Sequence, residues 1–326
     1  MTRVTVGGRL HFGFQNLSLA HERLYGGLGV ALESPTVVVE ATPADEVYCD
    51  DRCAREYARR TVDLLGVSGA DVRVLHTLPR HVGLGSGTQL ALAVFAAIAR
   101  AHGREPSVRE HAPALDRAGR SGIGVSTFER GGFVVDAGHP TERFTTDRPP
   151  RGDWSVPPVL ARHDVPADWR FVLALPDAEP GRSGDDEDSS MRSAVERADP
   201  TIADDIASIL VRRTLPSIAE DDPERFGCSV AEIGRRNGAW YADEQGGVYR
   251  PPVGELVTEM ETSPAVFGAG QSSWGPAVYG VTTRQLADEA VDAARTALDS
   301  TAIGGDVLVV SPRNRGADVD GDERKR

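Results

Sequence analysis

The feature that most limits how this chain can fold is a glycine-rich loop that runs directly into an apolar stretch. The loop reads G-L-G-S-G-T from Gly83 to Thr88, and the Ala/Leu-rich stretch after it stops at Gly103, a residue type that often follows helices. Closely spaced glycines let successive backbone N–H groups turn inward around an anion, and the N-terminal end of a helix adds positive partial charge. The loop therefore predicts a phosphate-binding turn, with a tight turn into a buried helix as the structural alternative.

The charged residues limit how such a phosphate site can be built. Lys325 is the only lysine among 36 Lys+Arg, against 49 Asp+Glu, and the net charge is −13. A P-loop lysine, a Schiff-base lysine and a buried lysine base are therefore excluded. Any phosphate site in this chain must use backbone N–H groups, hydroxyls, Mg²⁺ and arginines. The hydroxyls of Ser86 and Thr88 are available to cap the helix or to contact a phosphate or a Mg²⁺ ion.

The acid excess also bears on the environment and the partners of the protein. It favours adaptation to high salt over codon bias alone, because a GC-rich genome explains the arginines but not the acids. An acidic surface with no basic stripe repels nucleic acid. The three cysteines, Cys49, Cys53 and Cys228, are too scattered for a disulfide framework or a zinc site. The longest apolar run, Leu90 to Ala99, is about half a membrane span, so we expect a cytoplasmic protein with no membrane partner.

The hydrophobic periodicity predicts two α+β domains. Residues 1–150 alternate short strands with a helix at Arg52–Leu65, and residues 165–315 begin with a strand at Phe171–Leu175 and continue with helices. A shift to Pro, Arg, Asp and Trp at residues 145–168 indicates a linker between them. The polar stretch Glu179–Ser190 indicates a loop or a lid, and residues 316–326 a charged, dispensable tail.

Two further glycine-rich segments carry polar groups. In R-L-H-F-G, the alternation of a strand places Arg9 and His11 on one face, and Y-G-G-L-G follows from Tyr25. The segment from Val266 to Val281 surrounds Gln271, Ser272 and Trp274 with glycines. The structural alternatives are a half-buried histidine and a packed tryptophan. Buried amides and hydroxyls each need a hydrogen-bond partner, however, so such a polar cluster is costly to keep for packing alone.

Together these segments resemble β-ribofuranosylaminobenzene 5′-phosphate synthase, a member of the GHMP kinase superfamily that is not a kinase. The matching motifs run from Arg9 to Ala317: the glycine loop, R-L-H-F-G with Y-G-G-L-G, R-S-G-I-G-V-S-T-F-E-R-G-G-F, G-A-G-Q-S-S-W-G-P-A-V-Y-G-V and S-P-R-N-R-G-A. The resemblance implies the two-domain GHMP kinase fold, with an N-terminal domain like domain 2 of ribosomal protein S5 and a ferredoxin-like C-terminal domain. It implies a site between the domains, a homodimer and, with the acidic composition, a halophilic archaeal source.

The resemblance also implies a reaction. Such synthases join 5-phosphoribosyl 1-diphosphate (PRPP) to 4-aminobenzoate or 4-hydroxybenzoate, release pyrophosphate and CO₂, and make the C-riboside of the methanopterin pathway. In many GHMP kinases the stretch matching Ser121–Gly124 ends in an aspartate, whereas this chain has Gly124, which argues against phosphoryl transfer to an alcohol. An ATP-dependent GHMP small-molecule kinase and a non-catalytic protein that binds a phosphorylated ligand remain as alternatives.

We therefore expect the motifs to surround one cleft. The catalytic candidates are Arg9, His11, Gln271 and Ser272. The candidates for PRPP and phosphate binding are Arg80, Gly83, Gly85, Ser86, Gly87, Thr88 and Arg120. The arene pocket is assigned to Tyr25, Gly27 and Trp274, and Mg²⁺ to Ser86 and Thr88. Because a substrate as anionic as PRPP needs local positive charge on an acidic protein, Arg23 should join Arg9, Arg80 and Arg120 in one basic funnel.

Overall fold

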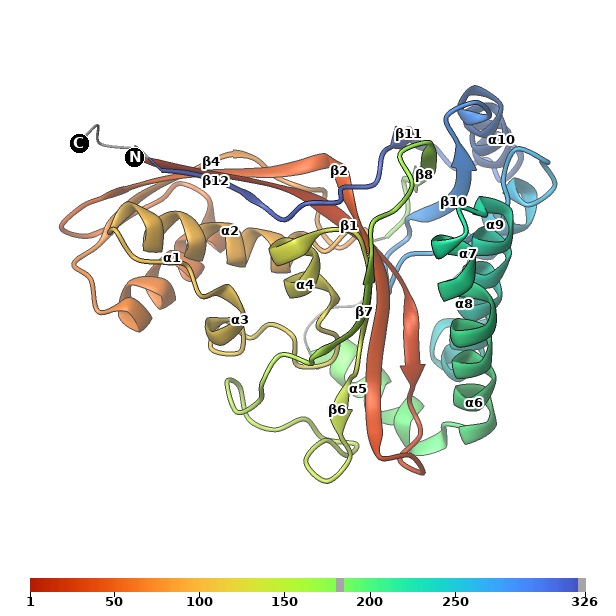
Figure 1. Ribbon diagram of the computed structural model, residues 1–326, viewed down its shortest axis with the longest axis horizontal. Coiled ribbons are helices and arrows are strands. Elements are labelled where there is room, and N and C mark those ends of the chain that lie inside the picture. Colours follow the sequence, from red (N-terminus) through yellow and green to blue (C-terminus); the bar gives the residue numbers. More distant parts are fainter. Residues whose placement is uncertain (180–184, 322–326) are drawn as a thin grey trace.

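The computed structural model describes residues 1–179 and 185–321, and its framework is two β-sheets with helices packed on them (Figure 1). The eight-stranded sheet follows the order β12-β1-β2-β4-β3, with β5 and β6 paired to β2, and β7 paired to β5. Its strands are β1 (Thr2–Asn16), β2 (Arg23–Pro43), β3 (Val47–Tyr48), β4 (Ala70–His76), β5 (Phe133–Asp136), β6 (His139–Pro140), β7 (Val159–His163) and β12 (Asp318–Gly321). The four-stranded sheet has the order β11 (Gly305–Val310), β8 (Trp169–Pro176), β10 (Val278–Thr283) and β9 (Ala269–Gln271). The predicted α+β class is confirmed.

The long hairpin of β1 and β2 connects the two halves of the molecule. Its strands pair antiparallel from Thr2 opposite Ala41 to Asn16 opposite Tyr25. A register shift between His11 and Gly13 interrupts the ladder, as a β-bulge does when it bends a strand and re-aims its side chains. Beyond this shift, the hairpin runs alongside the helices of the second half (Figure 1). The segment that carries His11 therefore lies where the two halves meet.

The helices of the first half cover one face of the large sheet. They are α1 (Arg52–Leu65), α2 (Ser86–Ala101), α3 (Val108–His111) and α4 (Ile123–Arg130). The bounds predicted for the first helix agree with α1, which begins after Asp51, whose side chain accepts a hydrogen bond from the Ala54 N–H at the N-cap. Helix α2 is buried from Gln89 to Ala99, because α1 and α4 pack on it from one side and β1 and β2 from the other. The apolar run in the sequence is therefore a core helix.

The second half places helices on both faces of the small sheet. They are α5 (Asp185–Arg197), α6 (Pro200–Ile209), a π-helical turn η1 (Leu210–Thr214), α7 (Leu215–Ala219), α8 (Pro223–Gln245), α9 (Val253–Met260) and α10 (Ala287–Ser300). Side chains of β8 alternate between two apolar clusters, as a two-residue period requires. Phe171 and Leu173 pack in the main core with Phe226 of α8, whereas Val172 packs with α9 and α10. No helix within the described residues is long and apolar enough to cross a membrane.

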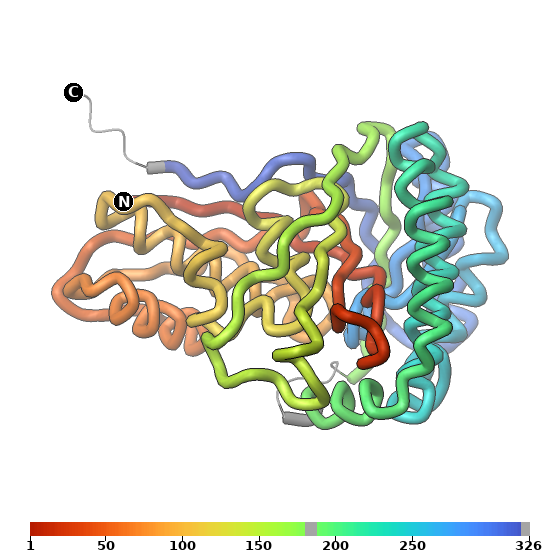
Figure 2. The backbone as a smooth tube through the Cα atoms, turned by 60° about the horizontal axis from the view of Figure 1, so that its bottom comes forward, coloured from red at the N-terminus to blue at the C-terminus, as the bar shows by residue number. Residues whose placement is uncertain are grey.

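Three predicted boundaries need correction. Strand β7 lies inside the predicted linker and pairs with β5. Residues 185–190 of the predicted loop belong to α5, and residues 180–184 lie outside the described residues. The predicted tail contains β12, which pairs with β1 at the edge of the large sheet. In Figure 2 this last segment, in blue, returns across the first half beside the red N-terminal strand.

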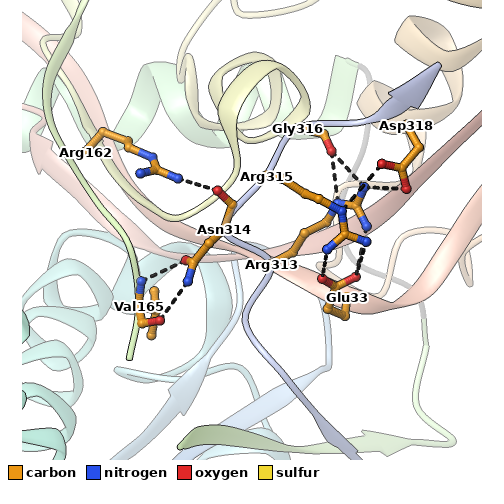
Figure 3. A network of polar contacts seen from close by, with 8 residues as sticks. All are labelled: Glu33, Arg162, Val165, Arg313, Asn314, Arg315, Gly316 and Asp318. Atoms are coloured by element: carbon orange, nitrogen blue, oxygen red, sulfur yellow. Dashed lines mark hydrogen bonds and ion pairs between the residues drawn. The ribbon is translucent and has the colours of Figure 1, made fainter. Parts of the chain in front are cut away.

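A cluster of buried polar contacts explains why the C-terminal segment is ordered (Figure 3). Arg313 is 2% exposed, and its guanidinium contacts Glu33 at 2.9 Å, Asp318 at 3.0 Å and the Gly316 carbonyl at 2.7 Å. The Asn314 side chain accepts from the Val165 N–H and donates to the Val165 carbonyl, both at 2.8 Å. Glu33 and Val165 are far from Arg313 and Asn314 in sequence, so hydrophobic periodicity cannot predict this cluster.

Candidate functional site

A cavity of about 510 Å³ lies beside the glycine loop. Its wall combines the loop at residues 83–88, β1, the segment 116–121 between α3 and α4, and the turn 273–275 after β9. Four segments that are far apart in sequence therefore meet at one site. Three of them are the glycine-rich motifs found in the sequence.

The glycine loop has the open conformation expected of an anion-binding turn. Gly83 and Gly85 have φ values of +98° and +80°, a region that side chains other than glycine rarely adopt. Helix α2 begins at Ser86 with Gly85 as its N-cap, and no described side chain caps it. The prediction that Ser86 or Thr88 caps the helix is therefore wrong. The first-turn N–H groups are left for a ligand, together with the positive end of a buried helix.

Ser272 connects this loop to β1 without lining the cavity. Its side chain is fully buried; the Oγ accepts a hydrogen bond from the His11 N–H at 3.1 Å and donates to the Gly83 carbonyl at 2.7 Å. A side chain at Gly83 would collide with the Ser272 carbonyl. Ser272 thus sets the distance between the strand that carries His11 and the loop. Gln271 also lies outside the main cavity, where its amide contacts the Arg250 N–H and the Ser273 carbonyl.

Three of the four arginines predicted to converge do line the cavity. Arg9 donates to the Gly83 carbonyl at 2.5 Å and packs over Gly85. Arg80 is half-exposed in an ion pair with Asp51, and Arg120 is paired with Asp188. Arg23 does not join them. Its guanidinium donates to the Ala137 and Gly138 carbonyls at 2.6 and 2.7 Å, because that end of β2 pairs with β6. The prediction for Arg23 is wrong.

Two arginines of the cavity were missed in the sequence. Arg117 lies beside Gly87, and its guanidinium stacks on the Tyr57 ring at 5.3 Å and donates to the Tyr57 hydroxyl. Arg148 lies near Arg120, over the ring of Trp154. The available signal for Arg117 was its place three residues before Arg120 in one glycine-containing segment. Arg148 had no signal, since it lies in the stretch that composition assigned to a linker.

A buried hydrogen-bond chain begins at His11. The His11 Nε2 lies 3.1 Å from the Ser121 Oγ, and this hydroxyl donates to the Asp136 Oδ2 at 3.2 Å. Burial, with the nearby Arg9 charge as a lesser cause, lowers the pKa of His11 to about 3, so the imidazole is neutral at physiological pH. Burial also raises the pKa of Asp136 to about 6, although the N–H groups of Gly27, Gly122 and Gly138 stabilise its carboxylate.

The three residues assigned to the arene pocket separate in the structure. Tyr25 is buried beside Arg120, and Gly27 packs under Ser121 and Asp136, where it has no room for a side chain. Trp274 lies at the wall between the main cavity and a small neighbouring pocket of about 50 Å³. That pocket is lined by aromatic and polar groups, among them His11, Phe14, Tyr241, Tyr249 and Trp274.

Comparisons with known proteins identify the family and the fold of the chain. Residues 51–132 match the model of the GHMP kinases N-terminal domain. The chain is 34% identical to a β-ribofuranosylphenol 5′-phosphate synthase of Methanothermobacter thermautotrophicus, over 96% of this chain and 97% of that protein. It is 31% identical to the synthase of the same name from Archaeoglobus fulgidus, over 98% and 100% of the two chains. A homoserine kinase of Cytophaga hutchinsonii superposes with a TM-score of 0.64 at 17% identity, over 98% and 97% of the chains, which confirms the GHMP kinase fold.

Proposed function

Since the chain belongs to the family of β-ribofuranosylphenol 5′-phosphate synthases, we propose that it transfers the phosphoribosyl group of PRPP to the ring carbon of a 4-substituted benzoate, with loss of pyrophosphate and CO₂. The single observation that carries this proposal is the contact between two different cavities. A large arginine-lined cavity and a small aromatic pocket share His11, Phe14, Ser273 and Trp274 as a common wall.

The arginine-lined cavity supports binding of a substrate with two phosphorylated ends. Arg9 stands over Gly85 and Arg117 beside Gly87, so guanidinium groups flank the loop on both sides. Backbone N–H groups and guanidinium groups together can hold the departing diphosphate and stabilise the charge that it carries away. Arg120 and Arg148 also line the cavity and supply a second pair of positive charges, held by Asp188.

The small pocket is too small at about 50 Å³ to enclose a benzoate ring, but the aromatic side chains around it support packing of such a ring at the shared wall. The rings of Tyr241 and Trp274 meet edge to face at 4.5 Å, and those of His11 and Phe14 at 5.1 Å. Aromatic rings favour such geometries with one another, and a benzoate ring packed against His11, Phe14 and Trp274 from the main cavity would be in direct contact with the sugar. The names of the two relatives refer to a phenol product, which favours 4-hydroxybenzoate over 4-aminobenzoate as the acceptor.

The chemistry requires positioning more than a protein nucleophile. Departure of pyrophosphate leaves positive charge at C1 of the ribose, and the ring carbon that bears the carboxylate attacks C1 to form the new C–C bond. The C–CO₂ bond then breaks, and its electron pair returns to the ring and restores aromaticity. Neutral His11 adds no positive charge beside the ribosyl cation, and the cavity wall holds the ring within attack distance.

Mg²⁺ is part of the proposal, with Ser86 and Thr88 as the residues that would hold it. Both hydroxyls line the cavity at the first turn of α2, and the described residues contain no cluster of three or more His, Cys, Asp or Glu side chains that could hold a metal ion. A divalent cation would therefore take most of its ligands from the diphosphate and from water. When bound, it would neutralise charge on the leaving group.

The packing at Gly124 weighs against the kinase alternative. A Cβ atom at this position would lie 2.8 Å from the Thr88 Cγ2, so an aspartate at the place where many GHMP kinases carry one would displace Thr88. The homoserine kinase shares only 17% of its sequence with this chain, so the likeness indicates a common fold and not a common activity. We therefore expect no ADP when the protein is incubated with ATP and small alcohols.

The proposal is tested by measuring CO₂ release from carboxyl-labelled 4-hydroxybenzoate and 4-aminobenzoate with PRPP, at low salt and at molar salt. We expect labelled CO₂ and pyrophosphate in equal amounts, with a preference for the hydroxy acid. Formation of ADP from ATP without CO₂ would support the kinase alternative. Tight PRPP binding with formation of neither CO₂ nor ADP would support the non-catalytic alternative. Either of these two results would overturn the proposal.

A further inference from the structure

We propose that Arg120 and Arg148 form an oxyanion site that Asp188 occupies in the free protein and that one phosphoryl end of the substrate takes over on binding. The substrate's identity rests on the proposed function; the existence of the site does not. Asp188 lies in the first turn of α5, whereas the two arginines belong to the first half of the chain. The three residues line both the main cavity and a third cavity of about 200 Å³.

The Asp188 carboxylate is paired with both arginines. Its Oδ1 is paired with the Arg120 Nη2, and its Oδ2 lies 2.9 Å from the Arg148 Nη2. Each oxygen is thus held by a separate guanidinium, an arrangement that also suits two oxygens of a phosphoryl group. A phosphoryl group carries more charge than a carboxylate and offers a third oxygen, so it can compete for the same two arginines.

The arginines are built into the wall more firmly than the carboxylate. The Arg120 and Arg148 side chains are 11% and 28% exposed, against 42% for Asp188. The Arg148 guanidinium lies 5.8 Å from the centre of the Trp154 ring, and an added Cβ on Gly119 would be 2.9 Å from its Nη1. Asp188 therefore approaches from the solvent side and is the partner that can leave.

Asp188 also has a clear electrostatic purpose in the free protein. Two neighbouring guanidinium groups repel each other unless an anion lies between them. The Asp188 carboxylate keeps the two guanidinium groups in place. When a phosphoryl group of the substrate displaces this carboxylate, it pairs with the same two arginines. The site would then bind either the 5′-phosphate or the diphosphate of PRPP, while the glycine loop binds the other end.

The test is calorimetric binding of inorganic phosphate, pyrophosphate and ribose 5-phosphate at one ionic strength, to the whole chain and its variants. Removal of the competing charge in Asp188→Asn should tighten binding of pyrophosphate or ribose 5-phosphate roughly threefold to tenfold, the scale of one or two exposed ion pairs. The ligand whose affinity increases in Asp188→Asn identifies the end of PRPP, diphosphate or 5′-phosphate, that binds at this site. Arg148→Gln added to Asp188→Asn should reverse the gain.

Asp116→Asn is the matched control. Asp116 lines the same cavity, pairs with Arg151 at 3.3 Å instead of with Arg120 or Arg148, and has a positive φ that asparagine tolerates. An equal gain in Asp116→Asn would mean that net charge alone governs binding and would overturn the site. Unchanged or weaker anion binding in Asp188→Asn would also overturn the proposed site. So would an Arg148→Gln single variant that binds all three anions as tightly as the native protein. None of these measurements requires turnover, so failure of CO₂ release would not affect them.

Discussion

The His11 Nε2 lies 3.1 Å from the Ser121 Oγ at the wall of the cavity, and this contact decides which nitrogen of the imidazole carries the proton. The Ser121 hydroxyl has one hydrogen, which it donates to the Asp136 Oδ2. The same oxygen must then accept from His11, so the neutral ring carries its proton on Nε2 and keeps the lone pair on Nδ1. Ser121 and Asp136 are positioning residues for His11.

Ser121→Ala should therefore release the orientation of His11. We expect kcat to fall by up to about a hundredfold, as for small displacements of a group at the reacting centre, with little change in KM for PRPP. The ¹⁵N spectrum of His11 should change from the single Nε2–H tautomer to a mixture. Ser126→Ala is the control, because this buried hydroxyl lies nearby in α4 but accepts from Arg109 at 3.0 Å and has no contact with His11 among the described hydrogen bonds. An unchanged His11 spectrum in Ser121→Ala would contradict the tautomer assignment.

The stability of the protein should fall as the pH drops below about 6.5. In the folded protein, burial lowers the pKa of His11 to about 3 and that of His139 to about 4, against an ordinary value of 6.5. At intermediate pH the unfolded chain binds two protons that the folded protein does not. Asp136 acts in the opposite direction between 3.8 and about 6, because its folded pKa is raised. The net difference of one proton gives a slope of about 1.4 kcal/mol per pH unit between about pH 4 and 6.

Urea unfolding at a series of pH values measures this slope. His139→Gln removes one of the two proton-binding differences, so the slope should decrease by about 1.4 kcal/mol per pH unit. The His139 ring is stacked on Phe144 with centroids 3.8 Å apart, and the variant should also lose some stability at every pH. A variant with the native slope would show that His139 is not neutral in the folded protein.

Arg9 and Arg23 separate phosphate binding from structural support. Arg9→Gln removes a guanidinium from the glycine loop, and we expect KM for PRPP to rise roughly tenfold to hundredfold, the range for a hydrogen bond to a charged group. Arg23→Gln removes two hydrogen bonds to carbonyls outside the cavity, so thermal stability should fall while KM for PRPP stays native. Steady-state kinetics and thermal unfolding of both variants give the comparison. Equal effects on KM would return Arg23 to the binding site.

Arg313 and Arg315 share the same two acidic partners but differ in burial. Arg313→Gln removes a buried guanidinium that pairs with Glu33 and Asp318 and donates to the Gly316 carbonyl, and we expect a loss of about 1.5–3 kcal/mol of unfolding free energy, the range for a hydrogen bond to a charged group. Arg315, which is 60% exposed, also pairs with Glu33 and Asp318. Its replacement by Gln should cost below about 1 kcal/mol. Urea unfolding of the two variants measures the difference, and similar losses would refute a structural role specific to the buried arginine.

Much of the local structure could be predicted because it depends on residues close together in sequence. The helix Arg52–Leu65 has the bounds that its hydrophobic periodicity predicts. Arg9 and His11 line one cavity, as alternation along a strand requires. The short strand β12 was missed, since it is stabilised by pairing with β1 and by the distant partners of Arg313.

Amino-acid order and composition alone are enough to predict the turn of the glycine loop, the buried helix that follows it and the need for arginines in place of lysines at a phosphate site. These are properties of local backbone sterics and of composition. The convergence of particular arginines depends on long-range packing, because Arg23 is directed by the pairing of β2 with β6 and Arg148 by its contact with the Trp154 ring. Long-range packing also decides the charge of His11, because desolvation depends on every segment that packs around the ring.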